Sequence, residues 1–176
     1  MKTKRLLVLT LFLIGCGTTT ALKIPKGNKV KVNVAGEIYV EVPTKKNAST
    51  SALGPDILTK MKTSLESQLL KRCFKVARVG KGKYVLKTTI LTYEPGSALK
   101  RWILPGWGAT LLRAKSILAK GADKKTIAEI DFDGNVTAGG FYTVGADEYI
   151  VDWFGEELAK KLREAVGGPS DCATAS

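Results

Sequence analysis

The first sixteen residues place the strongest constraint on what this chain can become. Lys2, Lys4 and Arg5 give it a positively charged start. An apolar run over residues 6–14 follows, which is shorter than the roughly 20 residues that a membrane-spanning helix needs. A basic start followed by an apolar run of this length is typical of the signal peptide of an exported protein. We therefore predict that residues 1–15 are a cleaved signal peptide and take no part in the folded domain.

The apolar run ends at Leu13-Ile14-Gly15-Cys16, a tetrapeptide that resembles the bacterial lipobox. In proteins with this motif, the cysteine thiol receives a diacylglycerol, the signal peptide is removed, and the new amino terminus is acylated. The resemblance implies that Cys16 is lipidated and begins the mature chain. Two or more acyl chains, at about 0.8 kcal/mol per buried methylene, would hold such a chain firmly on a membrane. The alternative is an ordinary secretory signal in which Cys16 has no special role.

The residue after Cys16 indicates where an anchored chain would lie. Gly17 stands in the position where an Asp commonly retains Gram-negative lipoproteins at the inner membrane. We therefore expect a lipid-anchored protein of the bacterial cell envelope, on the outer membrane and facing the periplasm if the host is Gram-negative. Residues 16–29 are predicted to be the lipid anchor and tether, residues 30–166 a single domain, and residues 167–176 a disordered tail.

Size and charge limit the possible partners. Removal of the signal peptide would leave 161 of the 176 residues, which is the size of one domain with a substantial core. Three of the 28 basic residues and none of the 16 acidic residues would be removed, so the net charge falls from +12 to +9. Because export argues against nucleic acid, the nearest polyanions are anionic lipid headgroups, lipopolysaccharide phosphates and acidic polysaccharide. The alternative is a solvated basic surface without a ligand.

The chain contains no histidine, which removes the usual general base and the commonest transition-metal ligand. After Cys16 only Cys73 and Cys172 remain, too few for a four-cysteine zinc site. We therefore predict no cofactor, no metal site and no catalytic residues. The two cysteines could pair in an oxidising compartment. We predict instead a buried thiol at Cys73 and a free thiol at Cys172, because antiparallel helices would hold the two residues about a helix length apart.

Hydrophobic spacing predicts strands, a helix, further strands and a final helix. The first helix starts at Gly54-Pro55 and the second runs from about residue 147 to 166, each with apolar residues three or four positions apart. A polar loop is expected over residues 44–53 and a long loop over residues 94–108. This order predicts an α+β fold, with a small antiparallel or mixed sheet and two amphipathic helices packed on one face. The predicted strands cover residues 30–34, 37–42, 74–79, 84–93, 111–119 and 126–136.

Asp131 and Asp133 form the most tempting cluster for chemistry, since paired carboxylates can bind calcium or serve as acid and base. The spacing around them lacks the further ligands of an EF-hand loop. Alternation along the predicted hairpin places both acids on the solvent face, in registers that bring them beside Arg113 and Lys115. We therefore predict a ladder of cross-strand ion pairs. The alternative is a metal or catalytic site.

The long loop contains Lys100, Arg101, Trp102 and Trp107, with aliphatic residues between the two indoles. Such a segment could lie in a headgroup region or dock a partner protein. We treat these four residues as candidate contacts with a partner or with the membrane. The alternative is a loop that folds its aromatic side chains over an open end of the core.

Several short motifs in the second half of the chain are similar to those of a known family. Residues 93–97 read Tyr-Glu-Pro-Gly-Ser, and Arg101 and a glycine-containing stretch at 106–108 follow. A patch of small residues with doubled glycine occupies residues 136–141. With the hairpin and the closing helix, these motifs resemble the bacterial lipoproteins grouped as domain of unknown function 4410, over about residues 30–166. The resemblance implies an exported α+β lipoprotein domain, and it supplies no activity and no catalytic residues.

These features together predict a non-enzymatic lipoprotein that Cys16 anchors to the membrane. It would act as a binding or assembly module for an envelope protein or an anionic glycolipid, with no nucleic acid partner. One alternative is an envelope hydrolase that uses Asp131 and Asp133. Another is a polyanion-binding lipoprotein with no protein partner.

Overall fold

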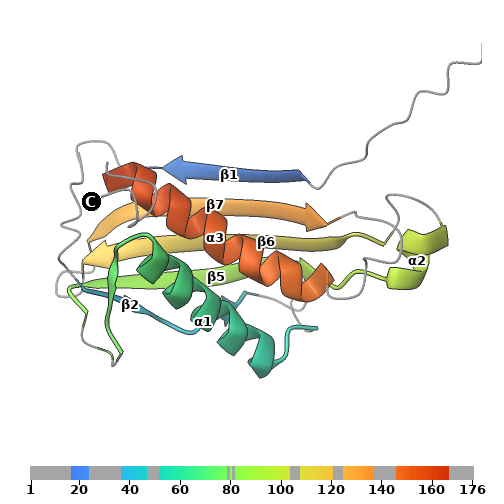
Figure 1. The fold of residues 1–176 in the computed structure, drawn as a ribbon, viewed down its shortest axis with the longest axis horizontal. Helices are drawn as coiled ribbons and strands as arrows, with labels where there is room; N and C mark the ends of the chain where they lie inside the picture. The colour runs from blue at the N-terminus through green and yellow to red at the C-terminus, as the bar shows by residue number, and fades with distance from the viewer. Residues whose placement is uncertain are drawn as a thin grey trace, which may run out of the picture.

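A computed structural model describes residues 17–23, 37–46, 52–78, 80, 82–103, 108–120, 125–136 and 146–166. Within these residues, seven strands form one mixed sheet, and two long helices pack on one of its faces (Figure 1). The predicted α+β class, with both amphipathic helices on one face, is confirmed. The predicted signal peptide, Cys16 and the predicted tail lie outside this described part. None of the helices in it is both long and apolar enough to cross a membrane.

The sheet has the strand order β1-β7-β6-β5-β2-β4, with β3 also paired to β5. Strands β1, β7, β6 and β5 pair antiparallel, whereas β2, β3 and β4 join by parallel pairing. The sheet is therefore mixed. The strands are β1 (Gly17–Lys23), β2 (Glu37–Val40), β3 (Thr44–Lys45), β4 (Lys75–Val76), β5 (Tyr84–Glu94), β6 (Thr110–Lys120) and β7 (Thr126–Val136).

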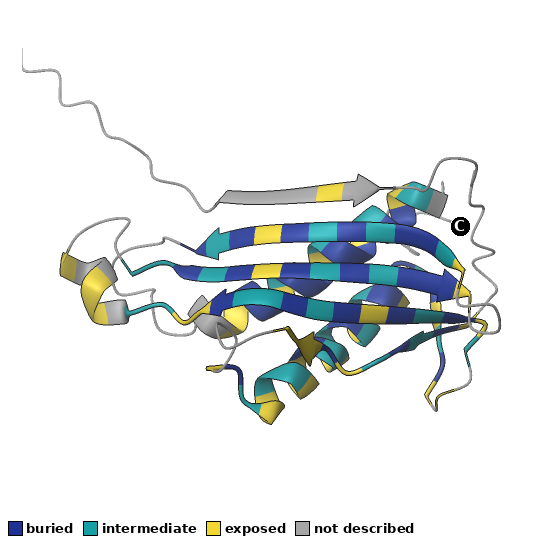
Figure 2. Cartoon of the chain, turned by 180° about the vertical axis from the view of Figure 1, so that it is seen from behind, coloured by how far each residue is buried: buried dark blue, intermediate teal, exposed yellow. Residues whose placement is uncertain are grey.

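The central strands β5, β6 and β7 have eleven residues each, and β6 with β7 confirms the predicted hairpin. Their side chains alternate between a buried face and a face that is half-buried or exposed, as Figure 2 shows from behind the sheet. A bulge between Ile90 and Thr92 shifts the alternation, so that Tyr93 is buried as well. The buried face supplies one half of the core, with Leu86, Ile90, Leu112, Ala114, Leu118, Ile130 and Phe132.

The segment predicted as a tether differs from the prediction. Gly17–Lys23, within the predicted tether at 16–29, form β1 and pair with β7 along the whole strand. Three consecutive threonines favour extended backbone, and the pairing gives hydrogen-bond partners to the outer edge of β7. The sheet therefore already includes Gly17, ahead of the predicted domain boundary at residue 30.

Strands β2 and β3 lie one after the other along the same edge of β5. Residues 41–43 separate them, and Pro43 cannot donate a ladder hydrogen bond because it has no N–H. The strand predicted over 37–42 is thus shorter than expected, and β3 lies in the predicted polar loop at 44–53. The strand predicted at 30–34 lies outside the described residues.

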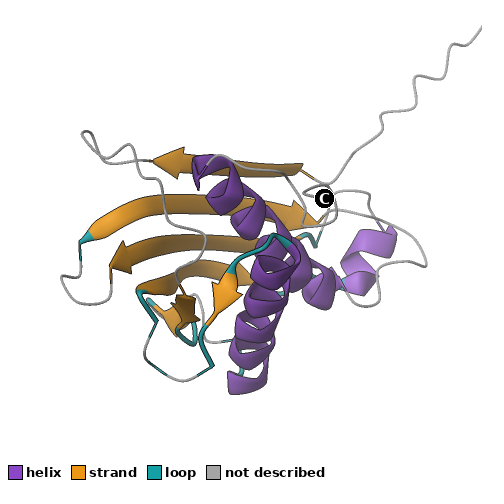
Figure 3. Ribbon diagram, turned by 60° about the vertical axis from the view of Figure 1, so that its left-hand side comes forward, coloured by secondary structure: helices purple, strands orange, loops and turns teal. Residues whose placement is uncertain are grey.

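The two predicted amphipathic helices are confirmed as α1 (Pro55–Lys71) and α3 (Ala146–Val166). Both helices cover the same face of the sheet (Figure 3). Each buries one stripe of apolar side chains against that face. Phe132 of β7 meets Phe154 of α3 edge to face, with 5.1 Å between ring centroids. The helices supply the other half of the core, with Met61, Leu65, Leu69, Ile150, Phe154, Leu158 and Leu162.

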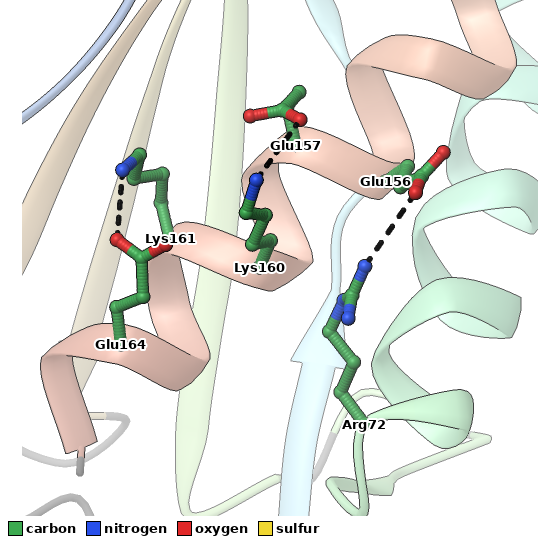
Figure 4. Close-up of polar contacts among 6 residues, drawn as sticks. All are labelled: Arg72, Glu156, Glu157, Lys160, Lys161 and Glu164. Atoms are coloured by element: carbon green, nitrogen blue, oxygen red, sulfur yellow. Dashed lines mark hydrogen bonds and ion pairs between the residues drawn. The ribbon is translucent and has the colours of Figure 1, made fainter. Parts of the chain in front are cut away.

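The two long helices run in the same direction, so the prediction of antiparallel helices is wrong. Lys60 near the start of α1 forms an ion pair with Glu148 near the start of α3. Arg72, directly after α1, reaches Glu156 further along α3 at 3.8 Å (Figure 4).

The helix direction follows from the pairing of β4. The prediction assumed that residues 74–79 form a hairpin with the next strand. Instead β4 and β5 lie on opposite sides of β2, and both run parallel to it. β2, β5 and β7 therefore all run in the same direction. Helix α1 follows β2 and β3, and α3 follows β7, so both helices run in the direction opposite to these strands.

Cys73 also differs from the prediction, because it is disulfide-bonded rather than a buried free thiol. It lies just beyond α1, with a φ of 66°, after the helix ends at Arg72. The other two cysteines of the chain, Cys16 and Cys172, lie outside the described residues. The expectation of a free thiol rested on antiparallel helices. In the observed order, the carboxyl ends of both helices lie at the same end of the sheet.

The parallel helix pair depends on a close approach at Gly155, and we expect Gly155→Val to be destabilising. A Cβ atom at Gly155 would lie 2.7 Å from Ser64 Oγ and 3.3 Å from the Ser64 carbonyl carbon. Overpacking of this kind should lower the free energy of unfolding by about 1–3 kcal/mol in urea denaturation. Gly80→Ala is the control, because a Cβ there has no neighbour within 4 Å. An unchanged unfolding midpoint for Gly155→Val would contradict this helix packing.

Candidate functional site

Strand register locates the residue that follows Cys16. Gly17 lies opposite Asn135 of β7, Asn135 opposite Leu111 of β6, and Leu111 opposite Glu94 of β5. These four residues form one row across an end of the sheet. Neighbouring strands lie about 4.8 Å apart, so the row places Gly17 about 14 Å from Glu94. Cys16 itself lies outside the described residues.

Helix α2 (Ala98–Ile103) follows β5 at this same end of the sheet. The segment 94–108 was predicted to be a loop throughout, so its helical turn corrects that prediction. Figure 1 shows α2 beyond the ends of β5 and β6, apart from the two long helices. We call the end of the sheet that carries the row and α2 the α2 end.

Hydrogen bonds join the segment that leads into α2 to the segment that follows it. Ser97 caps α2, because its Oγ accepts a hydrogen bond from the backbone N–H of Lys100 at 3.3 Å. The N–H of Ser97 donates to the carbonyl of Gly108 at 3.0 Å, and the N–H of Gly96 donates to Oγ1 of the buried Thr110 at 3.1 Å. Gly108 has a φ of 74°, which favours glycine. The base of α2 is thus fixed to the start of β6.

Helix α2 presents two aliphatic side chains to solvent. Leu99 is 68% exposed and Ile103 is 55% exposed. The two residues are four positions apart, so they lie on the same face of the helix. Lys100, next to Leu99, is exposed as well. The α2 end therefore combines an apolar helix face with a cation.

The structure describes only some of the four residues that were predicted to contact a partner or the membrane. Lys100, Arg101 and Trp102 all belong to α2. The side chains of Arg101 and Trp102 lie outside the described part, as does all of Trp107. Leu99 and Ile103 were not among the predicted contact residues. Their i,i+4 spacing was the available signal, but the surrounding Pro and Gly residues indicated a loop.

The predicted ladder on the outer face of β6 and β7 is confirmed. Arg113 lies opposite Asp133, and Lys115 lies opposite Asp131. Arg113 Nε donates to Asp133 Oδ2 at 2.8 Å, and Lys115 Nζ lies 2.7 Å from Glu129 Oε1. Across the part of the chain that the structure describes, no three His, Cys, Asp or Glu side chains gather where they could hold a metal ion. Asp133 and Glu129 thus form cross-strand ion pairs, and Asp131 lies opposite Lys115 in the same ladder.

A polar groove of about 590 Å³ lies on the outer side of the α1–α3 pair. Thr59 and Thr63 in its wall donate hydrogen bonds to carbonyls of their own helix. Lys60 Nζ donates to Glu148 Oε1 at 2.9 Å across the groove. This hydrogen bond raises the pKa of Lys60 and lowers the pKa of Glu148. The contact between Lys60 and Glu148 links the amino-terminal part of α1 to that of α3.

Residues 19–140 match the model of a protein family described as domain of unknown function (DUF4410). This match confirms the resemblance that the motifs of residues 93–97 and 136–141 indicated. It also includes most of β1, which the sequence analysis had placed outside the domain. A comparison with curated proteins found no match.

Solved structures share the fold of this chain. Two crystal structures of PelC from Paraburkholderia phytofirmans, both described as dodecamers, have TM-scores of 0.55 and 10–11% sequence identity. They cover 84% of this chain and 98–99% of PelC. A protein of Xanthomonas campestris, described with the family DUF330, has a TM-score of 0.52 and 12% identity over 74% of this chain and 85% of its own. At these identities, the similarity shows a common fold.

The ladder geometry predicts that Asp131→Asn and Asp133→Asn each lower the free energy of unfolding by less than about 1 kcal/mol. Phe132→Ala is the contrasting variant between them, and it should cost about 3–5 kcal/mol because this ring is buried against Phe154. Isothermal titration calorimetry should show no binding of calcium or magnesium. Metal binding that Asp131→Asn abolishes would overturn the structural role.

Proposed function

The chain belongs to the DUF4410 family, and we propose that it is a lipid-anchored, non-enzymatic lipoprotein of the bacterial envelope. It would act as a binding or assembly module for an envelope protein or an anionic glycolipid. The observation that carries the proposal is the position of Gly17 as the first residue of a paired strand. A lipid on the preceding Cys16 would join the domain without a spacer and hold the α2 end near the bilayer.

The charges on the outer face of the sheet support a binding role over an envelope hydrolase. A hydrolase that uses Asp131 and Asp133 needs carboxylates free to act on a substrate. Here Asp133 is held by Arg113 at 2.8 Å, and Asp131 lies opposite Lys115. A polyanion-binding lipoprotein without a protein partner is the other alternative, and the net positive charge of the mature chain supports it.

The position after Cys16 supports an outer-membrane location facing the periplasm in a Gram-negative host. Gly17 stands where an inner-membrane lipoprotein commonly has Asp. It also begins β1, so the residue next to the anchor would belong to the fold itself.

Self-association is the assembly role that the similarity to PelC favours, since both PelC crystal structures are described as dodecamers. Among the described strands, β1 and β4 end the sheet order. β4 has only two residues, whereas β1 has seven. The outer edge of β1 is therefore the longer row of backbone groups that a second copy could pair with.

Lipidation of Cys16 is tested by mass spectrometry of the protein from a bacterial envelope. We expect a chain that begins at Cys16 and carries acyl groups. Cys16→Ser should move the protein from the membrane fraction to the soluble fraction, because it removes the atom that bears the lipid. Cys172→Ser is the control for the loss of a thiol. If Cys16 carries the lipid, this variant removes the only other cysteine of the chain that could pair with Cys73, and it should still leave the protein on the membrane. An intact Met1 terminus, or membrane association that survives Cys16→Ser, would refute the anchor.

Self-association predicts one discrete oligomer in native mass spectrometry of the acylated protein in mild detergent. The Cys16→Ser chain is the control, since it separates contacts between protein surfaces from the sharing of a detergent micelle. We expect it to form the same oligomer at micromolar concentration. Monomers alone at every concentration, for both proteins, would contradict self-association while leaving the lipid anchor unaffected.

A further inference from the structure

We propose that α2 is the membrane-contacting surface of the anchored protein. Leu99 and Ile103 enter the interfacial layer of the same leaflet that holds the lipid of Cys16, and Lys100 lies among anionic headgroups. The inference rests on the proposed function, because the lipid on Cys16 sets which end of the molecule faces the bilayer. It goes further in naming the residues and the lipid chemistry of that contact.

The first observation is the position of Gly17, the residue that follows Cys16. Cys16 directly precedes Gly17, and the Cα atoms of neighbouring residues lie about 3.8 Å apart. Gly17, Asn135, Leu111 and Glu94 form one row across the α2 end. An acylated Cys16 would therefore hold this whole row close to the headgroups. Only three residues separate Glu94 from the start of α2, which extends beyond the row (Figure 1).

The second observation is that α2 exposes apolar side chains to solvent. Among the described residues, five large hydrophobic side chains are exposed, and two of them, Leu99 and Ile103, share the six-residue α2. Of the other three, Leu70 lies on α1, Tyr149 on α3, and Val42 between β2 and β3. A lipid anchor would hold this end of the molecule on the bilayer. The apolar face of α2 could then be buried at the boundary between headgroups and acyl chains.

The positive charge of Lys100 indicates which lipids α2 would contact. Lys100 follows Leu99 directly, and its exposed ammonium can reach the headgroup level while its methylene stem lies along the apolar boundary. Each basic residue near a bilayer surface favours anionic lipids. The base of α2 is fixed by the bonds of Ser97 and Gly96 to the start of β6, so the helix meets the surface in a set orientation. The partner is thus a bilayer that contains anionic lipid.

The test measures the depth of α2 directly. Full-length protein is processed in a bacterial host and reconstituted in vesicles of phosphatidylcholine and phosphatidylglycerol with brominated acyl chains. One environment-sensitive fluorescent amino acid replaces either Leu99 or Leu70. Leu70 is the matched position, because it is 56% exposed but lies in the last turn of α1, at the opposite end of the sheet. Quenching by the brominated chains should be at least three-fold stronger at position 99 than at position 70.

Variants separate membrane contact from an effect of the probe. Ile103→Ser should reduce quenching at position 99 towards the value at position 70, whereas Leu70→Ser should leave it unchanged. Both replaced side chains are exposed, so circular dichroism should show an unaltered fold. Equal quenching at positions 99 and 70 would overturn the inference. Protection of position 99 from aqueous iodide without quenching by brominated lipid would also overturn it, in favour of a protein partner.

Mass spectrometry of the same vesicles distinguishes the two proposals. Acylated Cys16 with equal quenching counts against the membrane contact of α2 alone. Absence of the acyl groups with strong quenching at position 99 counts against the lipid anchor and supports the contact. Absence of both would overturn both proposals.

Discussion

Strands β5, β6 and β7 pair antiparallel over eleven residues each, and their register holds one set of apolar side chains against both long helices. A slip of one residue would turn that set towards solvent. The same register brings Arg113 opposite Asp133 on the outer face and sets where the ends of the sheet lie. β1 joins one side of this unit and β2 the other, so the row at the α2 end and the return direction of α1 both depend on it.

The two amphipathic helices and the long hairpin could be predicted because each carries an apolar repeat long enough to select one period. Two other features could not. β1 contains three threonines in a row, and this run shows no alternation of apolar and polar side chains. Its place in the sheet depends on β7, a partner distant in sequence. A strand was predicted at residues 74–79, but the two residues of β4 carry no pattern that specifies a partner. Its parallel pairing with β2 decides that the helices run in the same direction and not antiparallel.

The candidate site also has parts that could be predicted from the sequence and parts that could not. The ion pairs of Arg113 and Lys115 could be predicted, because two strands with known inward faces leave few possible registers. The α2 surface could not, since Leu99 and Ile103 read as ordinary apolar residues in a segment rich in Pro and Gly. That they share an end of the molecule with Gly17 depends on three successive strand pairings, which the local sequence does not specify.

The pairing of β1 with β7 joins distant parts of the chain, since 102 residues separate Lys23 from Thr126. A chain that enters its compartment amino end first delivers β1 long before the strand that will hold it. If Cys16 is lipidated as proposed, the backbone beside it would have no sheet to join until β7 arrives, and it would stay accessible to the enzymes that acylate and cleave at a lipobox. Closure of the β1–β7 ladder then withdraws that backbone. For a lipidated chain, the order of synthesis would thus separate two requirements on one short segment in time: enzymatic processing before the sheet is complete and strand pairing afterwards.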